Sequence, residues 1–230
     1  MKTHNANNDK DPLAFVGLCE VDFRDALEAA LHYCRRDIPV TPLFGKWPIF
    51  KGWQYRRFSE DDLPRFFGYG RNVGVVLGGL TGIVDVDLDN PVAVAAADLL
   101  PDSMESGREK SPRSHRWFIC DPAPPSRRYS VTKSMAARLM VEAGETTLVE
   151  LRSTGKQTVV APSTHPVDGD RYLWHSGEIC QIDREVLAGL VLDVAVLLAL
   201  NRPWGAASGS PYTRPATLAR AWDTSERSPF

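Results

Sequence analysis

The 230-residue chain lacks several features that assign proteins to common classes. Its four cysteines are far apart and form no CxxC pair, which argues against a structural zinc site and fits a reducing cytoplasm. Its glycines form neither GxxxxGK(S/T) nor GxGxxG, so the P-loop and the dinucleotide-binding fingerprint are both absent. The N-terminus has no apolar signal-peptide core, and the apolar stretch 186–200 is too short to span a bilayer comfortably. We therefore expect a cytoplasmic protein.

Composition and charge narrow the class further. With 43% hydrophobic and 24% charged residues, the chain has the composition of a soluble globular protein with ample material for a core. A net charge of −2 excludes a uniformly basic surface. Residues 108–138 nevertheless contain eight basic and two acidic residues, a band that could hold phosphates, although such runs are more often solvated faces.

The most informative segment is the acidic strand 82–90. It follows the apolar run 73–77 and the pair Gly78-Gly79, so we expect it to be the second arm of a hairpin. Strand alternation places three aspartates on one face, with Cα atoms of successive ones about 7 Å apart. Such carboxylates can converge on Mg²⁺ or Mn²⁺, which prefer hard oxygen ligands. The three aspartates are Asp85, Asp87 and Asp89.

The same acidic pattern has simpler explanations. A lone DxDxD is also typical of an exposed strand edge or of the start of a helix. Asp89 or Asn90 could cap the helix that Pro91 opens, because proline suits the first helical turn. We interpret Asp89 as a helix cap or supporting acid rather than as a metal ligand.

Hydrophobic periodicity predicts one α+β domain with mixed β-sheets flanked by helices. We expect residues 1–12 to be disordered, 13–202 to be folded, and the Gly-, Ala-, Ser-, Pro- and Thr-rich residues 203–230 to be a flexible tail or linker. The predicted helices are 21–36, 59–67, 91–100 and 183–200. The predicted strands are 73–77, 82–88, 115–119, 147–152, 158–162 and 172–174, with a polar loop over 101–113 and a second hairpin joining 147–152 to 158–162.

Two further elements follow the acidic strand in order. His115 stands at the head of a strand, inside a basic loop, and Glu150 follows the apolar pair Leu148-Val149. Two acids from one strand and a third from another would complete a carboxylate set for divalent metal, and a nearby histidine could hold the phosphates of a nucleotide. That arrangement suits nucleotidyl transfer. Alternatively, Glu150 forms a surface ion pair with Arg152, and His115 is an ordinary structural histidine.

These ordered elements resemble the archaeo-eukaryotic primase superfamily, specifically the prim-pol domains of plasmids, phages and mobile elements. The matching motifs are Asp85-Val86-Asp87, Ser114-His115 and Leu148-Val149-Glu150. The segment 155–166, which reads GKQTVVAPSTHP, and the segment 29–53 are also similar to that family, so the resemblance covers roughly residues 22–177.

The resemblance implies a primase-polymerase (RRM-like) catalytic core over residues 13–202. Asp85, Asp87 and Glu150 would bind Mg²⁺ or Mn²⁺, and His115 would contact the triphosphate of a nucleotide. Weaker candidates for phosphate or template contacts are Arg116, Arg152 and Lys156. The expected substrates are nucleoside triphosphates and a single-stranded DNA template, and the expected partner is a replicative helicase on the same or another chain. Tryptophans that could contact the template, or simply pack, are Trp47, Trp53 and Trp117.

The expected activity is therefore DNA-directed primer synthesis or extension by metal-dependent nucleotidyl transfer, with release of pyrophosphate. Two rival functions use the same residues. A non-catalytic nucleic-acid-binding module for replication initiation would keep the fold without turnover, and a metal-dependent nuclease would use clustered acids to cut phosphodiesters. A DxD glycosyltransferase has no support beyond that single motif.

Overall fold

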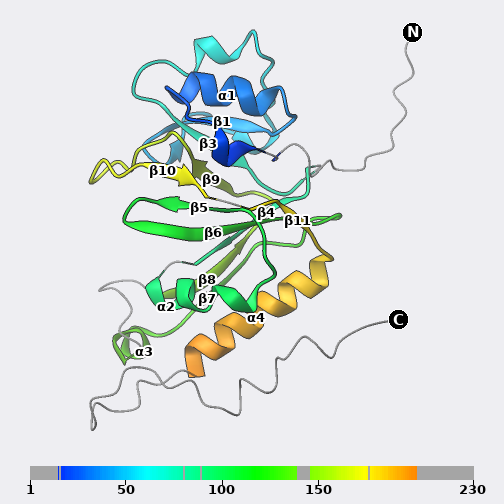
Figure 1. Cartoon of the computed structure of the whole chain (residues 1–230), viewed down its shortest axis with the longest axis vertical. Coiled ribbons are helices and arrows are strands. Elements are labelled where there is room, and N and C mark those ends of the chain that lie inside the picture. Colours follow the sequence, from blue (N-terminus) through cyan, green and yellow to red (C-terminus); the bar gives the residue numbers. More distant parts are fainter. Residues whose placement is uncertain are drawn as a thin grey trace.

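Two β-sheets form the centre of the molecule in this computed structural model, which describes residues 15, 17–79, 81–88, 90–138, 146–175 and 177–200. The termini that we expect to be disordered or flexible, and Asp89, lie outside these residues. Helix α1 (Ala26–Cys34) lies at one end of the molecule beside the first sheet, and α2 (Pro91–Ala95) and α4 (Arg184–Leu200) lie at the other end beside the second sheet (Figure 1). The mixture confirms the α+β class.

Among the described residues, the first sheet has four strands and the second has seven. The order in the first sheet is β2 (Trp47–Pro48), β1 (Val40–Phe44), β3 (Asn72–Val76), β9 (Gln157–Val160). The order in the second is β10 (Tyr172–Trp174), β5 (Glu105–Arg108), β6 (Ser111–Ile119), β4 (Ile83–Asp87), β8 (Thr147–Arg152), β7 (Arg127–Ser130), with β11 (Cys180–Gln181) parallel to β6. The remaining helical elements are α3 (Lys133–Arg138) and the 3-10 turns Leu18–Glu20, Trp53–Tyr55, Leu63–Arg65 and Ala97–Leu99.

Local sequence explains where the helices start. The Asp25 carboxylate accepts a hydrogen bond from the Glu28 backbone N–H, so α1 begins after Asp25 rather than at the predicted residue 21. Asn90 caps α2 in the same way by accepting from the Ala93 N–H. Helix α4 buries the face formed by Leu187, Val191, Val194, Ala195 and Leu198.

Both predicted hairpins are wrong. Strand β3 pairs with β1 and β9 in the first sheet, whereas β4 pairs with β6 and β8 in the second. Strands β8 and β9 are likewise in different sheets. The chain does reverse after the glycine pair, since Gly78 and Ile83 form an isolated antiparallel bridge, but the two strands on either side of this turn then join different sheets. Alternation of apolar and polar residues predicts a strand, but it does not predict which other strand it pairs with.

The connection from β3 to β4 passes close to the connection from β8 to β9. The Leu77 N–H donates to the Lys156 carbonyl at 3.0 Å, and the Gly79 N–H donates to the Thr154 hydroxyl at 3.1 Å. A Cβ at Gly78 would lie only 2.2 Å from the Thr154 backbone nitrogen. Gly78 also has a φ of 66°, a conformation that side chains other than glycine rarely adopt.

Two hydrophobic cores flank the second sheet. One core joins α1 and the first sheet to Ile83, Trp117 and Ile119 of the second sheet. The other core joins the opposite face of the second sheet to α2 and α4, and it contains Val84 and Val86. Because side chains alternate along β4, Asp85 and Asp87 share the face of Ile83 and point into the protein between the sheets. Within the described residues, no helix is both long and apolar enough to cross a bilayer.

Strand β5 lies inside the segment 101–113 that we predicted to be a polar loop. It pairs with β6, and a register shift between Ser106 and Arg108 accompanies the pairing. The short, interrupted pattern of this strand explains why sequence periodicity does not reveal it.

Candidate active site

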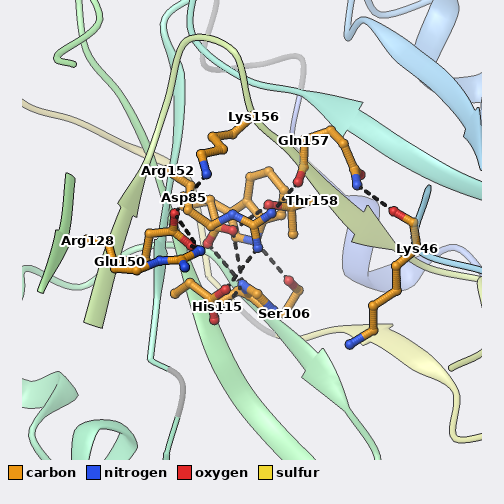
Figure 2. A network of polar contacts seen from close by, with 12 residues as sticks. Lys46, Asp85, Ser106, His115, Arg128, Glu150, Arg152, Lys156, Gln157 and Thr158 are labelled. Carbon is orange, nitrogen blue, oxygen red and sulfur yellow. Dashed lines mark hydrogen bonds and ion pairs between the residues drawn. The ribbon is translucent and has the colours of Figure 1, made fainter. Parts of the chain in front are cut away.

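The register of three neighbouring strands brings the predicted site residues together. Asp87 on β4 lies opposite His115 on β6 and opposite Glu150 on β8. Asp85 lies opposite Arg152 in the next row of the same face. Directly opposite residues of an antiparallel pair share one face and have Cβ atoms about 4.5–5.5 Å apart. Residues that are far apart in the chain therefore form a single polar group (Figure 2).

His115 contacts both aspartates. Its Nδ1 lies 3.0 Å and 3.2 Å from the two carboxylate oxygens of Asp85, and 3.6 Å from Oδ1 of Asp87. Burial lowers the pKa of His115, but the charges of Asp85 and Asp87 and the hydrogen bond to Asp85 outweigh it, so the pKa rises to about 9. His115 is therefore an imidazolium at neutral pH.

Asp85 joins the two sheets. Its side chain is fully buried, and besides the contact with His115 it accepts a hydrogen bond from the Thr158 hydroxyl on β9. Strand β9 belongs to the first sheet, so the carboxylate links both sheets at one point (Figure 2). Thr158 lies in a predicted strand, but no sequence signal indicates that its hydroxyl reaches Asp85.

Asp87 is paired with Arg152. The Arg152 Nη1 donates to Oδ2 of Asp87 at 2.9 Å, and its Nη2 donates to the Gln157 carbonyl. Burial opposes the charge of Arg152, but the carboxylates of Asp87, Asp85 and Glu150 outweigh it and raise the pKa of the guanidinium further. The structure thus places Arg152, one of the predicted phosphate contacts, at the centre of the site.

Glu150 is held by two cations. Lys156 Nζ lies 3.1 Å from its Oε1, and Arg128 Nη2 lies 3.3 Å from its Oε2 (Figure 2). Sequence reasoning missed Arg128, which lies opposite Glu150 on β7. The Arg127-Arg128 pair in the basic segment 108–138 was the one indication of this residue in the sequence. Strand β7 has only four residues and follows Pro124-Pro125, so it is too short for a pattern of alternating apolar and polar residues to predict it.

Arg116 lies away from this group. As the neighbour of His115 in a strand, it projects from the opposite face, where its Nη2 pairs with Glu105 at 2.5 Å and its Nη1 donates to the Ala97 and Leu100 carbonyls. Its guanidinium holds the end of the α2 region against β6. The structure therefore gives this predicted phosphate contact a packing position.

The predicted template tryptophans differ in exposure. Trp117 is fully buried and donates its indole N–H to the Ser106 hydroxyl, so its ring cannot stack on a base in this structure. Trp47 on β2 is 78% exposed, whereas Trp53 is half-buried.

The donor set fits a hard divalent cation in its chemistry, because three carboxylates share one face of adjacent strands. As these side chains stand, no group of three or more His, Cys, Asp or Glu residues in the described part of the chain converges as metal ligands do. The reason is visible in the contacts: each carboxylate already accepts from a protein cation. Four positive groups, Arg128, Arg152, Lys156 and the imidazolium of His115, face three carboxylates, so the site has positive charge to spare for an anion.

The fold and the site define an α+β protein with a buried group of acids and cations on one sheet face. The family described as "Bifunctional DNA primase/polymerase, N-terminal" matches residues 30–188, and the chain belongs to that family. The matched region includes every residue of the group, which confirms the resemblance inferred from the ordered motifs. A comparison with curated proteins finds no match to this chain.

Proposed function

We propose that this chain is a DNA-directed primase/polymerase domain that joins nucleotides on a single-stranded DNA template. Membership of the family supports this class of activity. The observation that carries the proposal is the register of β6, β4 and β8, because it gathers His115, Asp87 and Glu150 in one row and Asp85 in the next. An arrangement of acids with surplus cations is suited to a metal-bound polyphosphate.

In this proposal Asp85, Asp87 and Glu150 hold Mg²⁺ or Mn²⁺. The metal would supply Lewis-acid stabilisation of the attacking and leaving oxygens during an in-line displacement. The 3′-hydroxyl of the growing strand forms a bond to the α-phosphorus, the bond from that phosphorus to the leaving pyrophosphate breaks, and the hydroxyl proton leaves to solvent.

The cations of the site have a second role in the same scheme. Lys156 and Arg128 now neutralise Glu150, and Arg152 neutralises Asp87. If Glu150 and Asp87 bind a metal ion instead, the side chains of Lys156, Arg128 and Arg152 become available to phosphate oxygens. His115 would donate a charged hydrogen bond to the triphosphate from the opposite side of β4.

A specific observation favours a second candidate, the non-catalytic nucleic-acid-binding module. Every acid of the group is already neutralised inside the protein, so the fold is electrostatically complete without metal. A protein that kept this fold and lost turnover would look the same.

Nucleotide incorporation on primed and unprimed single-stranded templates, with Mg²⁺ or Mn²⁺, tests the proposal. The variants are Asp87→Asn and Glu150→Gln, which keep the side-chain shape, and the matched control is the exposed Asp61→Asn. We expect the site variants to lose at least about 100-fold in rate, as when one transition-state-stabilising group is removed, and the control to keep its rate.

The outcomes separate the candidates. Wild-type protein that binds DNA but incorporates nothing with either metal would favour the non-catalytic module. Shortening of the DNA without nucleoside triphosphate would indicate a nuclease. Incorporation by folded Asp87→Asn at the wild-type rate would remove that residue from the proposed metal site.

A further inference from the structure

The tip of the β1–β2 hairpin exposes two large aromatic side chains. Phe44 ends β1 and Trp47 begins β2, and the two residues are opposite each other in the strand register. Phe44 is 69% exposed and Trp47 is 78% exposed. Single exposed apolar residues are common, but two exposed aromatic residues opposite each other at a strand end form a surface that needs an explanation.

The backbone of this tip is held firmly. Asn72 donates its side-chain amide to the Gly45 carbonyl at 2.9 Å, and Gln157 donates its amide to the Lys46 carbonyl at 3.1 Å. Both amide side chains belong to buried residues. The turn is therefore fixed while the rings beside it are open to solvent, which suits a preformed binding surface.

The same contacts connect the tip to the candidate active site. Arg152 pairs with Asp87 and also donates to the Gln157 carbonyl, and the Gln157 side chain reaches the hairpin turn. Figure 2 shows Lys46 and Gln157 beside the group that contains His115 and Arg152. A ligand on the tip would thus be held in a fixed position relative to the acids.

The charge of the tip selects the kind of ligand. The Arg71 guanidinium lies 6.0 Å from the centre of the Phe44 ring, and Lys46 is exposed in the turn between the two aromatics. Aromatic rings beside cations suit unpaired bases with their phosphates, because every base has a face that can stack and every phosphate is an anion. A duplex hides its base faces within the stack, so a single strand fits better.

We infer that this tip, formed by Phe44, Lys46, Trp47 and Arg71, is a stacking platform for single-stranded DNA. The identification of that strand as the template rests on the proposed function. The stacking surface itself rests only on the exposed rings, the neighbouring cations and the fixed turn.

The test measures binding of a dye-labelled single-stranded oligonucleotide, and of the same sequence as a duplex, by fluorescence anisotropy without metal or nucleotide. The variant is Phe44→Ala with Trp47→Ala, and the matched control is Tyr55→Ala, an aromatic that is 89% exposed at the end of the 3-10 turn Trp53–Tyr55. We expect the double variant to bind the single strand about tenfold or more weakly, and the control to bind as wild type does, since each stacked base contributes separately. Trp47→Phe keeps a ring and should restore most of the affinity relative to Trp47→Ala.

Unchanged single-strand affinity in the double variant would overturn the inference and would leave the tip as a protein-binding surface. An equal loss for single strand and duplex would also overturn it, because stacking needs unpaired bases. If the wild type binds the single strand through the tip but incorporates no nucleotide, the platform stands and the proposed polymerase activity fails. Melting temperatures close to wild type, expected for substitutions of exposed side chains, establish that the variants are folded.

Discussion

The charge of His115 gives the sharpest quantitative prediction. Its pKa is about 9 in the folded protein, against 6.5 for an ordinary histidine, because two aspartates face it. A pKa that is higher in the folded state means that protonation stabilises the fold. This contribution is fully present below pH 6.5 and is lost as the pH rises through about 9. Each unit of difference between the folded and the ordinary pKa corresponds to about 1.4 kcal/mol, so protonation of His115 adds about 3 kcal/mol to the free energy of unfolding.

The assay is denaturant unfolding of the metal-free protein at several pH values between 6 and 10, for wild type and for His115→Gln. We expect the stability advantage of wild type over the variant to shrink by about 3 kcal/mol across this range. In an NMR titration, the ring protons of His115 should change near pH 9. His175 is the matched control, because burial, and then Arg113, lower its pKa.

The control should behave in the opposite sense. The pKa of His175 is lower in the folded protein than in the unfolded chain, so the unfolded chain binds the proton more readily. Protonation of His175 therefore lowers the free energy of unfolding as the pH falls. If His115 titrates at or below pH 6.5 in the metal-free protein, or if the difference between wild type and His115→Gln does not depend on pH, the reasoning about the two aspartates is refuted.

The sheet crossover and the buried arginine give two further predictions. Gly79→Ala should cost about 1–2 kcal/mol of unfolding free energy for its left-handed backbone, whereas Gly78→Ala should cost about 1–3 kcal/mol more because its Cβ would overlap Thr154. Equal costs in denaturant unfolding would contradict this crossover geometry. Arg116→Met should destabilise the fold by up to about 3–5 kcal/mol, because the buried Glu105 carboxylate would keep only its longer contact with Arg113 at 3.4 Å. Glu105→Gln in the same chain should recover part of the loss. A variant of full stability with weaker nucleotide binding would instead place Arg116 in the site.

The sequence was sufficient for the family, and it singled out residues that the structure brings together in the candidate site. Strand alternation is a local property, so it placed Asp85 and Asp87 on one face without any knowledge of their neighbours. The order of the acidic strand, the Ser-His element and the apolar-acid strand is also written along the chain, and it was enough for the resemblance that the family match confirms. The same alternation would have separated Arg116 from His115 had it been applied to both.

Only the tertiary structure decided which strands are neighbours. Glycine-containing connections at 78–79 and 153–155 have the appearance of hairpin turns, but they carry the chain between two sheets. Strand pairing depends on contacts between distant segments, which local periodicity does not encode. That pairing placed Arg128 opposite Glu150 and brought Thr158 to Asp85. It also buried the acids between two sheets, where the low local dielectric strengthens the attraction between each carboxylate and its neighbouring cation.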